Sequence, residues 1–226
     1  MDFNTLSTQY RGENARRYNE TRVADSKWQA EQIALQALLD TVPNGLRTLD
    51  VPVGTGRLFP FYKAKGFAGT GMDVSPDMLE EARAHAGELG IEVDLRVGDI
   101  RNISFPDATF DLVMCIRFLN WVDTAGLEVS LRELTRVARD RLLVGIRHMT
   151  PLGDFRPTPT DLVRIVRRSL GHATARARKS GLVYHQKADV YAIFKRLGVT
   201  VEAMRHVEKR SDGTDYFIYV LRKAKA

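Results

Sequence analysis

Residues 47–57 read RTLDVPVGTGR, a short apolar run followed at once by two glycines. Such a run is typical of a buried β-strand, and the residues beyond the glycines, as far as Lys65, have a helical pattern. Glycine lets a backbone approach a ligand closely, and the first turn of a helix offers free N–H groups. The stretch therefore predicts a strand, a ligand-binding turn and a helix in direct succession.

Similar units surround this stretch. A second strand at 69–74 leads into a helix at 75–89, with Ser75 as N-cap and Pro76 in the first helical position. Periodicity predicts further strands at 91–100, 110–118 and 140–148 and a helix at 127–138. A helix at 26–42 is predicted from the spacing of its apolar residues, Trp28, Ile33, Leu35, Leu38 and Leu39. Strands that alternate with helices imply a parallel sheet with right-handed crossovers.

The pattern changes after Thr150. A proline-rich connection leads to a predicted helix at 160–171, and a later helix at 187–199 has Gly198 placed to stop it. Two strands, at 199–207 and 216–222, follow as a hairpin. The predicted fold class is α/β: a Rossmann-like, seven-stranded, mostly parallel sheet with helices on both faces and a C-terminal antiparallel hairpin.

Composition excludes several classes of protein. A chain of 226 residues, 44% of them hydrophobic, can build the core of one domain. Its apolar runs are too short for a membrane span and its N-terminus has no signal-peptide pattern, so we expect a cytoplasmic protein. The single cysteine, Cys115, excludes an intramolecular disulfide and a cysteine-based zinc site, and we expect no metal.

Charge is distributed unevenly along the chain. Residues 1–113 carry 12 Lys and Arg against 17 Asp and Glu, whereas residues 114–226 carry 22 against 11. The basic half indicates an anionic partner, such as a nucleic acid or a phosphorylated or carrier-bound substrate, or else only solvated helix faces.

The glycine turn does not fit the common nucleotide fingerprints. The middle glycine of G-x-G-x-x-G can be aligned with Gly54 or with Gly56. The first alignment places Pro52 and Arg57 at glycine positions, and the second places Phe59 at one. The chain also has no P-loop and no Gly-x-Ser-x-Gly elbow.

The turn instead resembles the first motif of class I S-adenosylmethionine-dependent methyltransferases, acid-x-Gly-x-Gly-x-Gly. It runs from Asp50 to Gly56 and departs from the pattern only at Pro52, where proline removes an N–H and requires a negative φ. Residues 69–83, with Asp73 at 19 residues after Gly54, resemble the second motif, and residues 97–113 resemble the third. The chain resembles the small-molecule methyltransferases of this class, those with domains of types 11 and 25. The resemblance covers roughly residues 47 to 148.

The resemblance implies roles for individual residues. Asp73 would accept both ribose hydroxyls of S-adenosylmethionine, Asp99 the adenine amino group, and the Ile100 N–H would meet the ring. Cys115 and Arg117 would lie near the methionine moiety. The full expected cofactor set is Tyr18, Asp50, Pro52, Gly54, Thr55, Gly56, Arg57, Asp73, Val74, Met78, Asp99, Ile100, Cys115 and Arg117.

The resemblance also implies a division of the chain. We expect one methyltransferase domain over 1–226. Its parts are an N-terminal arm and helix (1–45), a cofactor-binding core (46–148), a substrate-side insertion (149–190), and a last helix with the terminal hairpin (191–226).

Several acceptor classes can be argued against. Residues 117–121 replace the Pro-Pro-aromatic motif of amino-directed nucleic-acid enzymes, Cys115 has no preceding proline as cytosine C5 enzymes require, and one cysteine cannot supply the thiols for arsenic methylation. An oxygen, carboxylate or amine of a small molecule remains. His148 and His185 are candidate general bases, although a structural histidine is the alternative for both.

Residues 162–188 contain no acid and seven Arg and Lys. We therefore expect an anionic acceptor, with the substrate-binding residues Asn120, Trp121, Arg164, Arg167 and Arg168. Two alternatives stay open: a nucleic-acid methyltransferase that contacts the RNA or DNA backbone, and a regulatory subunit that binds the cofactor without catalysis. The sequence leaves the oligomeric state open.

Overall fold

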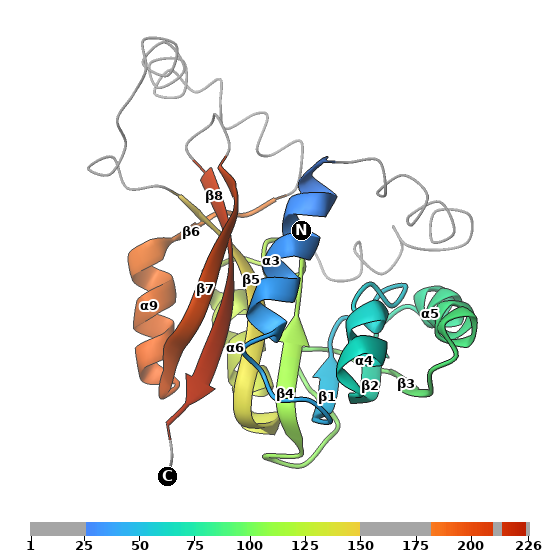
Figure 1. Cartoon of the computed structure of the whole chain (residues 1–226). Coiled ribbons are helices and arrows are strands. Elements are labelled where there is room, and N and C mark those ends of the chain that lie inside the picture. Colours follow the sequence, from blue (N-terminus) through green and yellow to red (C-terminus); the bar gives the residue numbers. More distant parts are fainter. Residues whose placement is uncertain (1–25, 150–181, 210–213, 225–226) are drawn as a thin grey trace.

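A computed structural model of the chain describes residues 26–149, 182–209 and 214–224. One mixed sheet forms its centre, with the strand order β3-β2-β1-β4-β5-β8-β7 (Figure 1). The strands are β1 (Arg47–Asp50), β2 (Ala68–Asp73), β3 (Val93–Val97), β4 (Phe110–Cys115), β5 (Ala138–Met149), β6 (His185–Gln186), β7 (Val199–Lys209) and β8 (Thr214–Lys223). The first five run parallel, and β8 pairs antiparallel with both β5 and β7. The predicted fold class is confirmed.

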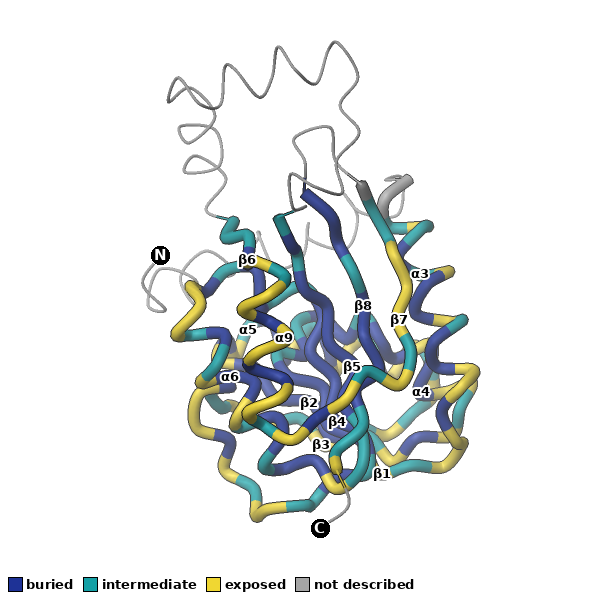
Figure 2. Tube along the Cα trace, turned by 90° about the vertical axis from the view of Figure 1, so that its left-hand side faces the viewer, coloured by how far each residue is buried: buried dark blue, intermediate teal, exposed yellow. Residues whose placement is uncertain are grey.

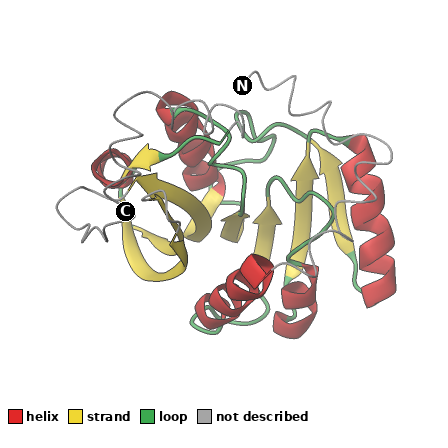
Figure 3. Cartoon of the chain, turned by 90° about the horizontal axis from the view of Figure 1, so that it is seen from above, coloured by secondary structure: helices red, strands yellow, loops and turns green. Residues whose placement is uncertain are grey.

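Helices cover both faces of the sheet, as the view from above shows (Figure 3). They are α3 (Ser26–Leu39), α4 (Phe59–Lys65), α5 (Pro76–Leu89), α6 (Thr124–Val137) and α9 (Lys187–Arg196). Buried side chains of α3, α4 and α5 form one core cluster with one face of the sheet, and those of α6 and α9 form a second with the other face. Burial therefore follows the strands and the inner sides of the helices (Figure 2).

Local signals fix where the helices begin and end. The Ser75 Oγ accepts a hydrogen bond from the Met78 N–H at 3.3 Å and caps α5, as predicted. Asp123 caps α6 in the same way through the Gly126 N–H at 2.8 Å. Gly198, with φ of 65°, follows the end of α9.

The sheet has one strand more than the sequence predicts. The two-residue strand β6 pairs parallel with the end of β5, with His185 opposite His148. Two residues are too few to produce an alternating pattern, so this strand carries no sequence signal. Strand β5 also continues past β4, because Cys115 at the end of β4 lies opposite Val144. The last residues of β5 thus project beyond the edge where β4 stops.

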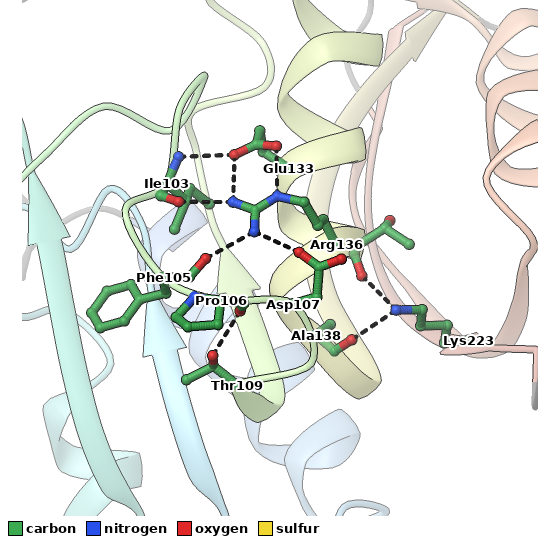
Figure 4. Close-up of polar contacts among 10 residues, drawn as sticks. Ile103, Phe105, Pro106, Asp107, Thr109, Glu133, Arg136, Ala138 and Lys223 are labelled. Atoms are coloured by element: carbon green, nitrogen blue, oxygen red, sulfur yellow. Dashed lines mark hydrogen bonds and ion pairs between the residues drawn. The ribbon is translucent and has the colours of Figure 1, made fainter.

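The amino ends of β4 and β5 are held by an arginine (Figure 4). Arg136 of α6 donates to the carbonyls of Ile103 and Phe105, both at 2.8 Å, and pairs with Asp107 at 2.9 Å and Glu133 at 2.8 Å. These contacts fasten the segment before β4 to the end of α6. The contacts lie at the amino ends of the strands. Ligands of such sheets bind at the opposite edge, where the carboxyl ends of the strands lie.

Within the described ranges, no helix has the length and apolar character needed to cross a bilayer.

Candidate functional site

The carboxyl ends of β1, β2 and β4 lie side by side and carry Asp50, Asp73 and Cys115 as their last residues. The turn after β1 brings the backbone across this edge, and its Val51–Pro52 peptide bond is cis. Gly54 and Gly56 have φ of 54° and 79°, a region that favours glycine. A Cβ at Gly56 would also lie 2.3 Å from the ring of Phe59. Both glycines are therefore required by the path of this turn.

Asp73 ties the glycine turn to the start of α5. Its Oδ2 accepts the Gly54 N–H at 2.9 Å, and its Oδ1 accepts the Ser75 N–H at 3.0 Å. Burial raises the pKa of Asp73, while the N–H groups of Ser75, Gly54 and Val74 act in the opposite direction. A carboxylate oxygen can accept more than one hydrogen bond, so each oxygen keeps capacity for a ligand hydroxyl.

Asp99, which follows β3, is held by Arg101. Its Oδ1 accepts the Arg101 N–H at 2.8 Å, and its Oδ2 accepts the Arg101 Nε at 2.9 Å. Burial acts to raise the pKa of Asp99, but these hydrogen bonds outweigh it and the pKa is lowered. Asp99 is thus fixed as an acceptor at the end of β3, next to the strand that carries Asp73.

A buried ion-pair cluster lies beside the glycine turn. Glu31 of α3 is fully buried and contacts both Arg57, which follows Gly56, and Arg117, whose Nε donates to Oε2 at 2.6 Å. The Arg57 guanidinium also lies over the ring of Trp28, 4.6 Å from its centroid. Arg117 has φ of 63°, so the backbone turns sharply just after β4. Helix α3 is in this way connected to the end of the glycine turn and to the segment after β4.

Comparison with known proteins agrees with this geometry. Residues 48–141 match the family described as "Methyltransferase domain". This part of the chain is therefore similar to a methyltransferase domain.

Relatives of known name are similar to part of the chain. The chain is 41% identical over 97 residues to phosphatidylethanolamine N-methyltransferase of Cereibacter sphaeroides, an alignment covering 42% of this chain and 46% of that protein. It is 36% identical over 81 residues to ubiquinone biosynthesis O-methyltransferase of Xanthomonas axonopodis pv. citri. This alignment covers 35% of this chain and 34% of that protein. The chain thus spans less than half the length of these relatives.

A solved structure is similar over nearly the whole chain. Magnesium protoporphyrin IX methyltransferase from Synechocystis PCC 6803, with bound S-adenosylhomocysteine, superposes with a TM-score of 0.72 over 99% of this chain and 100% of that one. The two are 17% identical, so this likeness shows the fold.

The other predicted cofactor residues that the structure describes lie around the same edge. Thr55 is buried in the turn, and its carbonyl contacts the His85 Nδ1 at 3.2 Å. Val74 is exposed just after β2, whereas Met78 and Ile100 are buried. Burial raises the pKa of the Cys115 thiol well above its usual range, and Asp50 adds to this. Pro52 lies in the turn itself, and Tyr18 is outside the described residues.

The two predicted general bases are buried and close together. His148 and His185 are each 1% exposed, and they face each other across β5 and β6. The His185 Nε2 lies 2.9 Å from the Leu119 carbonyl, and the His148 Nε2 lies 2.8 Å from the Tyr219 hydroxyl. The Nδ1 of each has no hydrogen-bond partner in the structure's described part. Each histidine therefore has one nitrogen fixed and one available.

The predicted substrate residues fall into two groups. Asn120 is buried, and its Oδ1 accepts the Arg147 N–H at 2.7 Å, so its side chain supports the projecting end of β5. Trp121 donates its Nε1–H to the Arg117 carbonyl at 3.1 Å. The three predicted insertion arginines lie outside the described residues: Arg164, Arg167 and Arg168.

Sequence reasoning missed several residues of this edge. Glu31 carries a usable signal, because it lies three residues after Trp28 and four before Leu35, on the apolar side of its helix. Tyr216, Tyr219 and Arg147 carry none, since only the pairing of β8 with β5 brings them to the edge. The described residues contain no group of three or more His, Cys, Asp or Glu side chains that could hold a metal ion.

Proposed function

We propose that the chain binds S-adenosylmethionine and transfers its methyl group to an oxygen, a carboxylate or an amine of a small, anionic acceptor. The observation that carries the proposal is the position of Asp73. Its carboxylate holds the glycine turn on one oxygen and the start of α5 on the other. A ligand lying across this turn would find two fixed acceptors for neighbouring hydroxyls.

The remaining residues fit this cofactor. Positive φ at Gly54 and Gly56 lets the backbone pass close to a ligand without a Cβ in the way. Asp73 would hold the ribose and Asp99 the adenine, in the order of their strands. The methionine end would then lie toward β4, near Arg57 and Arg117. The full set proposed for cofactor binding is the one predicted from the sequence.

The cofactor supplies an electrophilic methyl group, so the protein has to align the acceptor and accept its proton. A carbonyl can only accept, so the hydrogen bond to Leu119 places a proton on the His185 Nε2. The Nδ1 of His185, which has no hydrogen-bond partner among the residues that the structure describes, is then a lone-pair acceptor. Burial lowers the pKa of His185 and lowers that of His148 to about 4, so both are neutral at pH 7. We propose His185 as the general base, with His148 as its neighbour.

The names of the two curated relatives specify transfer to nitrogen and to oxygen, which supports these acceptor atoms. The excess of positive charge in residues 114–226 supports an anionic acceptor.

Labelled-methyl transfer tests the proposal. The chain is incubated with methyl-labelled S-adenosylmethionine and either a pool of small carboxylates and phosphorylated metabolites or total RNA. We expect label in the small-molecule pool and a shallow dependence on salt. Label in RNA, with a steep loss as salt rises, would replace the small acceptor by nucleic acid. Cofactor binding with no labelled product in either pool would indicate a regulatory role.

A further inference from the structure

Three arginines converge on the sheet face that α3 covers. Arg57 follows the glycine turn, Arg117 follows β4, and Arg147 lies near the end of β5. Their side chains are 11%, 30% and 11% exposed. We refer to Arg57, Arg117 and Arg147 as the guanidinium cluster.

The carboxylates that contact the cluster are fewer than its charges. Glu31 contacts Arg57 and Arg117, and Glu208 contacts the Arg147 Nη2 at 3.1 Å. Among these five side chains, three positive charges face two negative ones. The charge of Arg57 acts to lower the pKa of Asp50, but burial outweighs it and the pKa of Asp50 is raised. A buried, uncompensated positive charge is costly, so the cluster favours an added anion.

Unused hydrogen-bond donors lie in the same place. The Arg57 Nη2, the Arg147 Nη1 and the Tyr216 hydroxyl are buried and have no hydrogen-bond partner within the part of the chain that the structure describes. Tyr216 is 1% exposed, and Arg147 lies over its ring, 4.8 Å from the centroid. The charges of Glu31, Arg117, Arg57 and Arg147 all act on its hydroxyl. The unused donors are thus joined in one electrostatic site.

A glycine makes room for the hydroxyl. A Cβ at Gly145, on β5, would lie 2.2 Å from the Tyr216 oxygen. Any other residue at this position would displace the ring. The strand pairing therefore holds the Tyr216 ring under the guanidinium of Arg147, with its hydroxyl beside Gly145.

We propose that the guanidinium cluster and the Tyr216 hydroxyl bind a carboxylate of the methyl acceptor. This inference rests on the function proposed above and names the acceptor's anionic group. A carboxylate carries one negative charge, which matches the excess of one positive charge, and its two oxygens fit the planar guanidinium fork. A phosphate dianion would exceed that charge.

Arg57 and Arg117 lie where the cofactor's methionine end is proposed, so the positions of Arg147 and Tyr216 are what favour the acceptor as the bound carboxylate. Asp73 and Asp99 lie at the ends of β2 and β3, on one side of β1. Arg147 and Tyr216 lie on β5 and β8, on the other side, at least two strands from β1. Adjacent strands are about 4.8 Å apart, which places β5 roughly 10 Å from β1.

Calorimetry on the full chain tests this assignment. The protein is first saturated with S-adenosylhomocysteine and then titrated with benzoate and propionate, and with benzamide and propionamide as uncharged matches. We expect the carboxylates to bind and the amides not to. Arg147→Met and Tyr216→Phe should each weaken carboxylate binding, the first roughly tenfold or more. Arg205→Met, which removes an exposed arginine of β7, should leave it unchanged.

Tyr216→Phe keeps the test valid if Arg147→Met fails to fold, because it removes only a buried hydroxyl that has no hydrogen-bond partner among the described residues. Equal binding of carboxylates and amides would overturn the proposal. A second titration measures the binding of S-adenosylhomocysteine, and of 5′-methylthioadenosine, which lacks the amino-acid part, to the wild type and to Arg147→Met. If Arg147→Met weakens only the former, the cluster binds the cofactor's carboxylate and the acceptor assignment is wrong. Failure of S-adenosylhomocysteine to bind at all would count against the proposed function instead.

Discussion

Single side chains at the carboxyl edge of the sheet are oriented by partners far away in the sequence. Asp73 accepts an N–H from Gly54, 19 residues earlier, and Glu31 contacts Arg117, 86 residues later. In both cases a buried carboxylate is held on two sides. Such groups are fixed before a ligand arrives, which favours binding because little order has to be gained.

Replacing Asp73 with alanine tests its proposed role. Loss of the ribose contacts and of the support to Gly54 should weaken S-adenosylmethionine binding by about 1–3 kcal/mol, as measured by calorimetry. Asp94→Ala, which removes an exposed carboxylate of β3 paired with Arg96, is the matched control and should bind normally. Equal affinity of both variants and the wild type would remove Asp73 from the site.

Replacing His185 with glutamine separates catalysis from structure. The glutamine amide can still donate to the Leu119 carbonyl, but it has no counterpart of the Nδ1 lone pair. We expect stability close to that of the wild type and a methyl-transfer rate lower by roughly a hundredfold. The wild-type rate should fall as pH drops through the lowered pKa of His185, and the variant should lose this dependence. Unchanged rates in the variant would leave His185 with a structural role only.

Sequence reasoning found the residues whose contacts are local or belong to a motif. Ser75 caps α5 through a residue three positions away, and such a contact is visible in the sequence. Arg147 and Tyr216 meet only because β8 pairs antiparallel with β5. No local pattern encodes that contact, so the sequence predicts Arg57 and Arg117 at the site but not Arg147 and Tyr216.

At the scale of elements, the alternation of strands and helices was predictable because β1, β2, β4 and β5 are mostly buried and α5 and α6 have N-cap side chains. Prediction failed where an element is too short or lies at a surface. Strand β6 has two residues, and Ile33 is 72% exposed on α3 despite its apolar type. Apolar spacing predicts the helix, but it does not predict which apolar side chains the sheet covers.

The turn after β1 gives a prediction for an element. Gly56→Ala combines a positive φ with a Cβ 2.3 Å from the Phe59 ring, so it should lower the free energy of unfolding by about 1–3 kcal/mol. Gly87→Ala is the opposite case, an exposed helical position with open space, and should raise it by about 0.5–1 kcal/mol. Urea unfolding of both variants measures the two changes. A neutral Gly56→Ala would show that the turn tolerates a side chain.

At the scale of the whole molecule, the two faces of the sheet have different polar contents at the carboxyl edge. The α3 face holds Glu31 and the guanidinium cluster, whereas the face with α6 and α9 holds His148 beside Tyr219. The guanidinium cluster thus lies on one face and the buried His148 on the other. This division suits an enzyme that anchors an anion and accepts a proton at separate points.

The buried His148 links stability to pH. Its pKa is lowered from 6.5 to about 4, chiefly by burial, so the unfolded chain binds the proton more readily between these values. Stability from this group is present above pH 6.5 and is lost as pH falls toward 4. The loss from pH 8 to pH 5 should be about 2 kcal/mol.

Denaturant unfolding of the wild type and His148→Gln across this pH range measures the effect. The glutamine keeps a polar contact for Tyr219 but does not titrate. The difference between the two proteins should therefore change with pH in the stated direction. A difference that stays constant from pH 8 to pH 5 would show that His148 has an ordinary pKa.

The most direct test of the account is calorimetric titration of the purified chain with S-adenosylmethionine and S-adenosylhomocysteine. The account predicts that both bind with a dissociation constant in the micromolar range, and that Asp73→Ala weakens both. Absence of binding by the folded wild-type chain would contradict it, because the glycine turn and Asp73 would then hold no cofactor.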